Sequence, residues 1–208
     1  AHEAGAWVHV DGAFGMWAAA SPEHAHLMDG FNKADSAAVD GHKWLNVPYD
    51  CGLVLVRKPL PLRKAMAVSA AYLPDEDVRE PYDLVPEASR RARGVEVWAA
   101  IRSLGRDGVA DLIKRGCCHA QLFAQELGAA GFQIHNEVVL NQVLVSFGSP
   151  DETRRVIEGV QAEGTCWAGG THWQGQTAMR ISVSGWATTE ADVLRSVGAI
   201  VAVANGER

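Results

Sequence analysis

Two residues that could do covalent chemistry stand in separate parts of the sequence, Lys43 in "DGHKWLN" and Asp11 in "WVHVDG". A free lysine amine is protonated near neutral pH, with a reference pKa of about 10.4, and burial lowers the pKa of such an amine. A lysine at the mouth of a crevice could then form a Schiff base with a carbonyl, for example that of pyridoxal phosphate. That cofactor needs a carboxylate facing its pyridine nitrogen, and Asp11 is the candidate.

Short apolar runs predict the strands that would position these two residues. The runs are "WVHV" (7–10), "SAAV" (36–39) and "GLVLV" (52–56). Asp11 follows the first run, which reads as a buried strand, and Lys43 lies between the second and the third. Because ligands collect outside the carboxyl ends of strands in open α/β sheets, we expect the acid and the amine to lie near one crevice.

The rest of the chain predicts a long loop and a second unit. The proline-rich, charged stretch from Lys58 to Glu87 indicates a loop, with a binding or lid segment at about 66–88. A helical pattern then resumes, so we predict a large α/β domain over 1–105 and a small α+β domain over 106–208. The second domain is expected to contain these elements: a helix from Asp107 to Gly131, strands in "FQIH", "QVLVSF" and "MRISVS" with Arg180 at the start of the last, and helices capped at Ser149 and Thr189.

Composition narrows the class of protein. The chain has 208 residues, 48% of them hydrophobic, which predicts a folded core. Its net charge of -6 comes from mixed acidic and basic residues, which argues against nucleic acid or an anionic membrane as a partner. Four cysteines without a C-x-x-C pair or a disulfide framework favour a cytoplasmic protein, and no apolar run is long enough to span a bilayer.

Three smaller patterns receive structural interpretations. His24 and His26 are two residues apart in an expected helix, so they do not form a metal pair, and no metal site is predicted. His9 alternates with apolar neighbours and is expected to be a core histidine. The arginines at 90, 91 and 93 fit a subunit contact better than a nucleic-acid site.

The two central motifs also resemble a known family. "HVDGAFG", followed some thirty residues later by "DSAAVDGHKWLNVPYDCG", is similar to the pyridoxal-phosphate-dependent decarboxylases of group II, which act on glutamate and aromatic amino acids. Their pattern is H-V-D-A-A, then D-S-x-x-x-x-x-H-K-W with D-C shortly after, and Gly12 here replaces the first alanine. "EASRRARGVEVWAAIRSLGRDG" and "MRISVSGWATTEADV" extend the resemblance over essentially the whole chain. It implies the α/β aspartate-aminotransferase-like fold (fold type I), as the back part of the large domain and the small domain.

The resemblance implies roles for residues around the lysine. Lys43 would hold pyridoxal 5'-phosphate as an internal aldimine, Asp11 would pair with its pyridinium nitrogen, and Ala13 would lie against its ring. His42 would contact the phosphate or orient the lysine. The alternative for His42 is a partly buried ring packed on Trp44.

Three more residues are candidates by resemblance. Tyr72 matches a loop tyrosine that reaches the neighbouring subunit's active site and could protonate the carbon left after decarboxylation; packing on its own loop is the alternative. Arg180 would hold the substrate carboxylate through a guanidinium fork, or would pair on the surface with Glu163 or Asp192. Ser89 would contact the phosphate across a homodimer interface.

The function that follows is decarboxylation of an L-amino acid to its amine and carbon dioxide through Lys43. One alternative keeps the cofactor and gives an aldehyde synthase or another carbon–carbon lyase. A further alternative is an incomplete, non-catalytic fragment, because the family's phosphate-binding loop and ring-stacking histidine normally precede the residues present here. The identity of the amino acid is left open.

Overall fold

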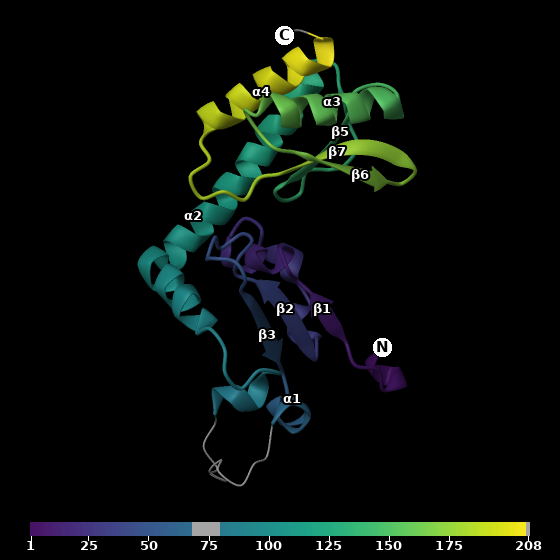
Figure 1. Ribbon diagram of the computed structural model, residues 1–208. Helices are drawn as coiled ribbons and strands as arrows, with labels where there is room; N and C mark the ends of the chain where they lie inside the picture. Colours follow the sequence, from purple (N-terminus) through teal and green to yellow (C-terminus); the bar gives the residue numbers. More distant parts are fainter. Residues whose placement is uncertain (68–79, 207–208) are drawn as a thin grey trace. The chain divides into compact units, whose positions relative to one another are not determined.

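A computed structural model describes residues 1–67 and 80–206 of the chain (Figure 1). Contacts divide the chain into two compact units. Unit 1 comprises Ala1–Ala19 with His24–Gly105, and unit 2 comprises Ala20–Glu23 with Arg106–Arg208. Tyr72 lies outside the described residues.

The sheet of unit 1 has three strands in the order β1-β2-β3. They are β1 (His9–Asp11), β2 (Ser36–Asp40) and β3 (Gly52–Val56), which confirms the three predicted strands. β1 runs parallel to β2, and β3 runs antiparallel to it. A parallel pair needs a crossover connection. Three short 3-10 helices supply it, η2 (Gly15–Ala20), η3 (Ala25–Met28) and η4 (Phe31–Lys33).

β1 was expected to be a buried strand with His9 in the core, and both expectations are wrong. His9 and Asp11 are exposed, because β1 stands at the edge of the described sheet and only one strand pairs with it. His9 is therefore not a core histidine; its Nδ1 lies 2.7 Å from the Ser36 hydroxyl on β2. Asp11 is the last residue of β1, as the pattern predicts.

The stretch predicted as one long loop contains two helical segments among its described residues. α1 (Pro59–Met66) is a helix, and η5 (Pro81–Leu84) is a 3-10 helix. Both have proline in the first helical turn, where the missing N–H has no intrahelical partner to lose. The prolines therefore stand at the starts of two helical segments. The sequence pattern had been interpreted as a loop because of its many prolines.

The helix α2 (Arg93–Ala129) is interrupted at one residue. Gly105 has φ 63° and ψ −174°, outside the helical region and in a conformation that glycine adopts readily. The second half of α2 therefore starts at Arg106, one residue before the predicted start at Asp107. The first half is helical as predicted, and its apolar residues Val95 and Trp98 are exposed.

Unit 2 contains a four-stranded antiparallel sheet in the order β4-β5-β7-β6. Its strands are β4 (Gln133–Ile134), β5 (Gln142–Ser146), β6 (Gly169–Trp173) and β7 (Gln176–Ser182). The helices α3 (Pro150–Glu163) and α4 (Glu190–Asn205) lie on one side of this sheet (Figure 1). Both have the predicted starts, since Ser149 with Glu152 and Thr189 with Asp192 form complete capping boxes.

The core of unit 2 joins its sheet to three helices. Buried side chains come from α2, β5, α3, β7 and α4, among them Leu127, Val143, Val160, Met179 and Val193, all at 0% exposure.

The strands of unit 2 differ from the sequence prediction in two respects. β6 was not predicted, and Arg180 lies in the second half of β7, not at the start of a strand.

Candidate active site

Asp11 ends β1 and Lys43 follows β2, and these two neighbouring parallel strands end at the same side of the unit 1 sheet. Asp11 pairs in register with Ala38 of β2, and β2 ends at Asp40, three residues before the lysine. Asp11 turns one carboxylate oxygen back to its own loop, where Oδ1 accepts a hydrogen bond from the Ala13 N–H at 3.1 Å. The amine and the carboxylate therefore occupy the sheet edge at which α/β proteins bind ligands.

The amine of Lys43 has two neighbours of different kinds. Its Nζ lies 2.8 Å from Oδ2 of Asp40 and 6.0 Å from the centroid of the Phe14 ring. The Lys43 side chain is 40% exposed, so the amine is within reach of a ligand. Asp40 was not among the predicted site residues, although a carboxylate at a strand end three residues before the lysine was a readable signal.

The loop that carries Lys43 is fixed from both sides of the lysine. His42 Nδ1 accepts a hydrogen bond from the Cys51 N–H at 2.9 Å, and its ring meets Tyr49 edge-on with centroids 4.4 Å apart. Trp44 is fully buried, with its ring 5.4 Å from Phe14. The His42 ring therefore packs against Tyr49, whereas the predicted alternative had it packed on Trp44.

Gly12 replaces an alanine of the family pattern for a visible reason. A Cβ added to Gly12 would come within 2.7 Å of the Met16 Cβ and 3.2 Å of the Ala38 carbonyl oxygen. The Gly12 N–H also donates to that carbonyl at 2.9 Å, which ties the turn after β1 to β2. Only glycine fits so close to Met16 and Ala38. The replacement leaves Asp11 and Ala13 at the places that they have in the family pattern.

The other predicted residues lie apart from this loop in the sequence. Ser89 is exposed and follows η5 in unit 1. Arg180 is exposed on β7 of unit 2, and within the described residues it forms no ion pair. Its expected surface partners are engaged elsewhere, since Glu163 accepts hydrogen bonds from Thr165 and Asp192 pairs with Arg195.

Two arginines of the basic cluster, Arg91 and Arg93, bind Asp50 in the segment that follows the Lys43 loop. Arg93 pairs with the Asp50 carboxylate at 3.0 Å, and Arg91 donates to the Asp50 carbonyl at 2.9 Å. Hydrogen bonding from Arg93 lowers the pKa of Asp50 below its usual range. Burial raises the pKa of the neighbouring Cys51 thiol, which disfavours the reactive thiolate form.

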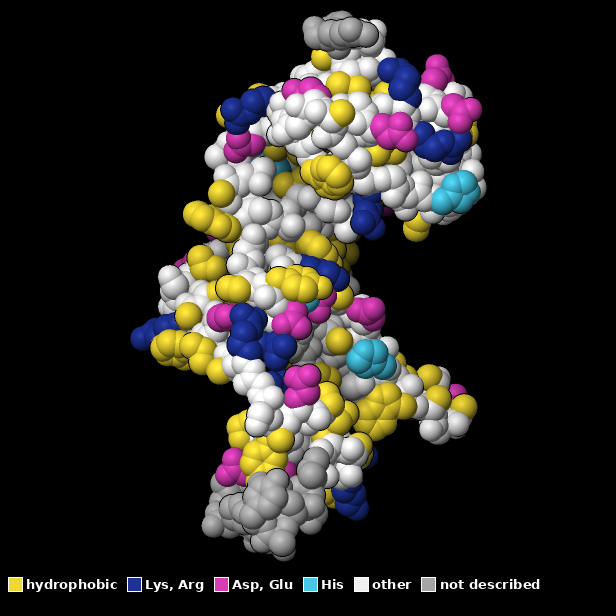
Figure 2. All heavy atoms as spheres, viewed as in Figure 1, with side chains coloured by type: hydrophobic (Ala, Val, Ile, Leu, Met, Phe, Trp, Pro, Cys, Tyr) yellow, Lys and Arg dark blue, Asp and Glu magenta, His cyan; other side chains and the backbone are white. Residues whose placement is uncertain are grey.

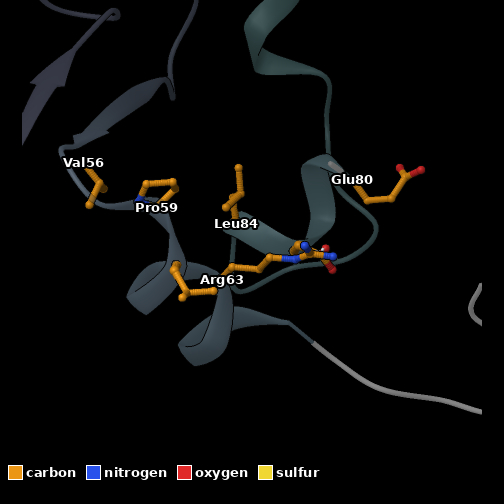
Figure 3. Close-up of a pocket in the computed structure, with 7 residues that line it drawn as sticks. Val56, Pro59, Arg63, Glu80 and Leu84 are labelled. Atoms are coloured by element: carbon orange, nitrogen blue, oxygen red, sulfur yellow. Dashed lines mark hydrogen bonds and ion pairs between the residues drawn. The ribbon is translucent and has the colours of Figure 1, made fainter. Parts of the chain in front are cut away.

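A separate cavity of about 430 Å³ lies between the end of β3, α1 and η5. Figure 3 shows Val56, Pro59 and Leu84 along it, with Arg63 reaching beneath Leu84 toward η5 and Glu80 turned away. Arg63 forms an ion pair at 3.0 Å with Asp83, which is buried. None of the predicted site residues that the structure describes lines this cavity.

The surface shows both signs of charge. On the face drawn in Figure 2, acidic and basic side chains are interspersed, and hydrophobic side chains are exposed among them. No cluster of three or more metal-ligating side chains occurs in the described residues. In the same residues no helix is long and apolar enough to cross a bilayer.

Comparison with known proteins decides the family. The model of the pyridoxal-dependent decarboxylase conserved domain matches residues 1–148, which include the whole Lys43 loop. The chain belongs to this family. The resemblance predicted from "HVDGAFG" and "DSAAVDGHKW" is thereby confirmed, and the predicted cofactor is the one for which the family is named.

Curated relatives agree with this family. The chain is 31% identical over 165 residues to the aromatic-L-amino-acid decarboxylase of Drosophila lebanonensis, covering 76% of this chain and 40% of that protein. It is 30% identical over 181 residues to the 4-hydroxyphenylacetaldehyde synthase of Rhodiola rosea, covering 82% of this chain and 37% of that protein. The chain thus spans about two fifths of the length of these relatives.

Solved structures confirm the predicted α/β fold type I. Oryza sativa TDC, solved with PLP and tryptamine, matches 97% of this chain and 45% of its own with a TM-score of 0.90 at 23% identity. The Rhodiola rosea 4-hydroxyphenylacetaldehyde synthase matches 99% of this chain and 44% of its own with a TM-score of 0.83 at 25% identity. The first of these likenesses concerns the fold alone.

Proposed function

We propose that the protein containing this chain is a pyridoxal-phosphate-dependent decarboxylase that converts an L-amino acid to its amine and carbon dioxide. One observation carries the proposal. A family member places a reachable amine, Lys43, and a carboxylate, Asp11, after adjacent parallel strands at one sheet edge. The names of the relatives make an aromatic L-amino acid the first substrate to test.

The donor set at this edge fits pyridoxal phosphate. The cofactor needs an amine for its aldehyde and a carboxylate for its pyridine nitrogen, and the edge offers one of each. When bound, the cofactor supplies an electron sink for the electron pair left by the departing carboxylate. Lys43 would hold it covalently, Asp11 would keep its ring nitrogen protonated, and Ala13 would lie against its ring.

Two residues next to Lys43, His42 and Trp44, would keep the lysine and its loop in place. The His42 ring is anchored to Cys51 through Nδ1, and its Nε2 is 3.7 Å from Asp40 Oδ2. This leaves the ring beside the lysine, where it would contact the phosphate or orient the amine. Trp44 fixes the loop on its other side by filling the core beneath it.

Residues outside the loop complete the proposal. Arg180, exposed and without an ion pair in the described part of unit 2, would bind the substrate carboxylate in bidentate fashion. Ser89 would contact the phosphate across the interface of a homodimer, and Tyr72 would donate the proton to the carbon after carbon dioxide leaves. A cytoplasmic homodimer is the assembly we propose.

The test compares Lys43→Ala with Lys58→Ala in the whole protein. Lys58 directly precedes α1, its side chain makes no capping hydrogen bond, and it has no proposed role, so its removal controls for the loss of a lysine. Lys43→Ala should abolish both the visible absorbance of the bound cofactor and the release of carbon dioxide. Turnover retained in Lys43→Ala would overturn the proposal.

Product analysis separates the two reactions of this fold. A decarboxylase releases amine and carbon dioxide in equal amounts and consumes no oxygen. The aldehyde synthase alternative consumes oxygen and releases aldehyde, ammonia and peroxide. Amine formation without oxygen uptake supports the proposal, and aldehyde with peroxide supports the alternative.

A further inference from the structure

Asp40 presents a carboxylate to the amine of Lys43. Its Oδ2 lies 2.8 Å from Lys43 Nζ, and its side chain is 22% exposed, so the pair stands partly out of water. His42 faces the same oxygen, with Nε2 at 3.7 Å. The Phe14 ring lies on another side of the amine, 6.0 Å from Nζ. Asp40 is therefore the charged partner that sets where Nζ rests.

The main chain of Asp40 is held at both of its polar groups. Its N–H donates to the Ala13 carbonyl at 3.0 Å, and its carbonyl accepts from Trp17 Nε1 at 2.9 Å. As the last residue of β2 it is also paired with Gly52 of β3. These contacts fix the carboxylate with respect to both the Asp11–Ala13 turn and the Lys43 loop.

This arrangement affects how available the lysine amine is. To attack a carbonyl, Nζ of Lys43 must first leave its ion pair with Asp40. An ion pair between partly exposed groups contributes up to about 1 kcal/mol, which is about fivefold in an equilibrium constant. Asp40 thus restrains Nζ of Lys43, and the size of this restraint can be measured.

We propose that Asp40 is a positioning residue for Lys43: its carboxylate holds Nζ at this edge of the sheet whenever Nζ is not bound to a carbonyl. A consequence for turnover rests on the proposed function. Once the substrate nitrogen has taken the place of Nζ on the cofactor, Asp40 would hold the released side chain of Lys43 close to the site.

The first test measures acetylation of Lys43 by acetic anhydride at pH 8 in the cofactor-free protein, quantified by peptide mass spectrometry. Asp40→Asn keeps the side-chain shape and removes the charge, so Lys43 should react about fivefold faster than in the unchanged protein. Asp40→Glu keeps a carboxylate and should stay near the original rate. Lys114, paired with Glu23 in unit 2, is the internal control and should not change.

Cys51 is buried directly before β3, and its alkylation reports whether unit 1 stays folded. If Asp40→Asn leaves Cys51 protected, equal Lys43 rates in Asp40→Asn and the unchanged protein overturn the proposal. If Asp40→Asn exposes Cys51, Asp40→Glu decides: slow acetylation of Lys43 supports a role for the charge, and fast acetylation overturns it.

A second test separates this proposal from the proposed function. Pyridoxal phosphate is added to the unchanged protein and to Asp40→Asn, followed by borohydride, and the rate of adduct formation at Lys43 is compared. A faster rate in Asp40→Asn supports both proposals. An adduct at Lys43 with unchanged acetylation rates overturns the role of Asp40 alone. No adduct at Lys43, with the acetylation difference intact, overturns the proposed function alone.

Discussion

Trp44 anchors the candidate active-site loop, and truncating it should loosen unit 1. The side chain is fully buried directly after Lys43 and packs near the Phe14 ring. Replacing a buried tryptophan with alanine removes its burial and leaves a cavity, which together cost about 3–5 kcal/mol. We therefore expect Trp44→Ala to lower the free energy of unfolding of unit 1 by that amount, a large share of the about 5–15 kcal/mol typical of a domain.

Trp44→Phe is the matched control. Trp44 Nε1 is buried and has no hydrogen-bond partner in the described residues. An unsatisfied buried N–H costs about 1–3 kcal/mol, so removing it offsets part of the smaller volume of phenylalanine. We expect Trp44→Phe to cost less than about 2 kcal/mol, clearly below the alanine variant.

The assay reads each unit through its own buried thiol. Pulsed alkylation across a urea gradient, resolved by peptide mass spectrometry, follows unit 1 at Cys51 and unit 2 at Cys117. Burial raises the pKa of Cys117 to about 11 and also raises that of Cys51, so both thiols react mainly after unfolding. A Cys51 transition that Trp44→Ala shifts by less than about 1 kcal/mol, or that both variants shift equally, would refute this reasoning.

Two further predictions concern unit 2 and are read at Cys117. Ser149→Ala removes the Ser149–Glu152 capping box and should lower the free energy of unfolding by about 1 kcal/mol; an unchanged transition would contradict the assigned start of α3. Burial, helped by the nearby charge of Arg115, lowers the pKa of His119, so the unfolded chain binds the proton more tightly. Stability should therefore fall as the pH drops below the ordinary histidine pKa of about 6.5, and His119→Gln should lessen this fall; an equal fall in both proteins would exclude His119 as its cause.

The parts of the site that follow from local sequence could be predicted. Three short apolar runs located β1, β2 and β3, and the strand end located Asp11. Ser149 and Thr189 predicted the starts of α3 and α4, because a capping box is formed by residues only three positions apart in the sequence.

Features that depend on distant contacts were missed. β6 ("GGTHW") lacks an alternating apolar pattern, and its strand conformation comes from pairing with β7. The exposure of β1 depends on which strands cover it, which an apolar run does not specify. The hydrogen bond from the Cys51 N–H to His42, which ties the Lys43 loop to the start of β3, likewise joins residues that are nine positions apart.

The central claim is that Lys43 is the lysine to which pyridoxal phosphate binds. The most direct measurement is peptide mapping after the whole protein is treated with the cofactor and reduced with borohydride. The account predicts that the adduct is concentrated on Lys43, in preference to the chain's other lysines at positions 33, 58, 64 and 114. An adduct spread evenly over those lysines, or absent from Lys43, would contradict it.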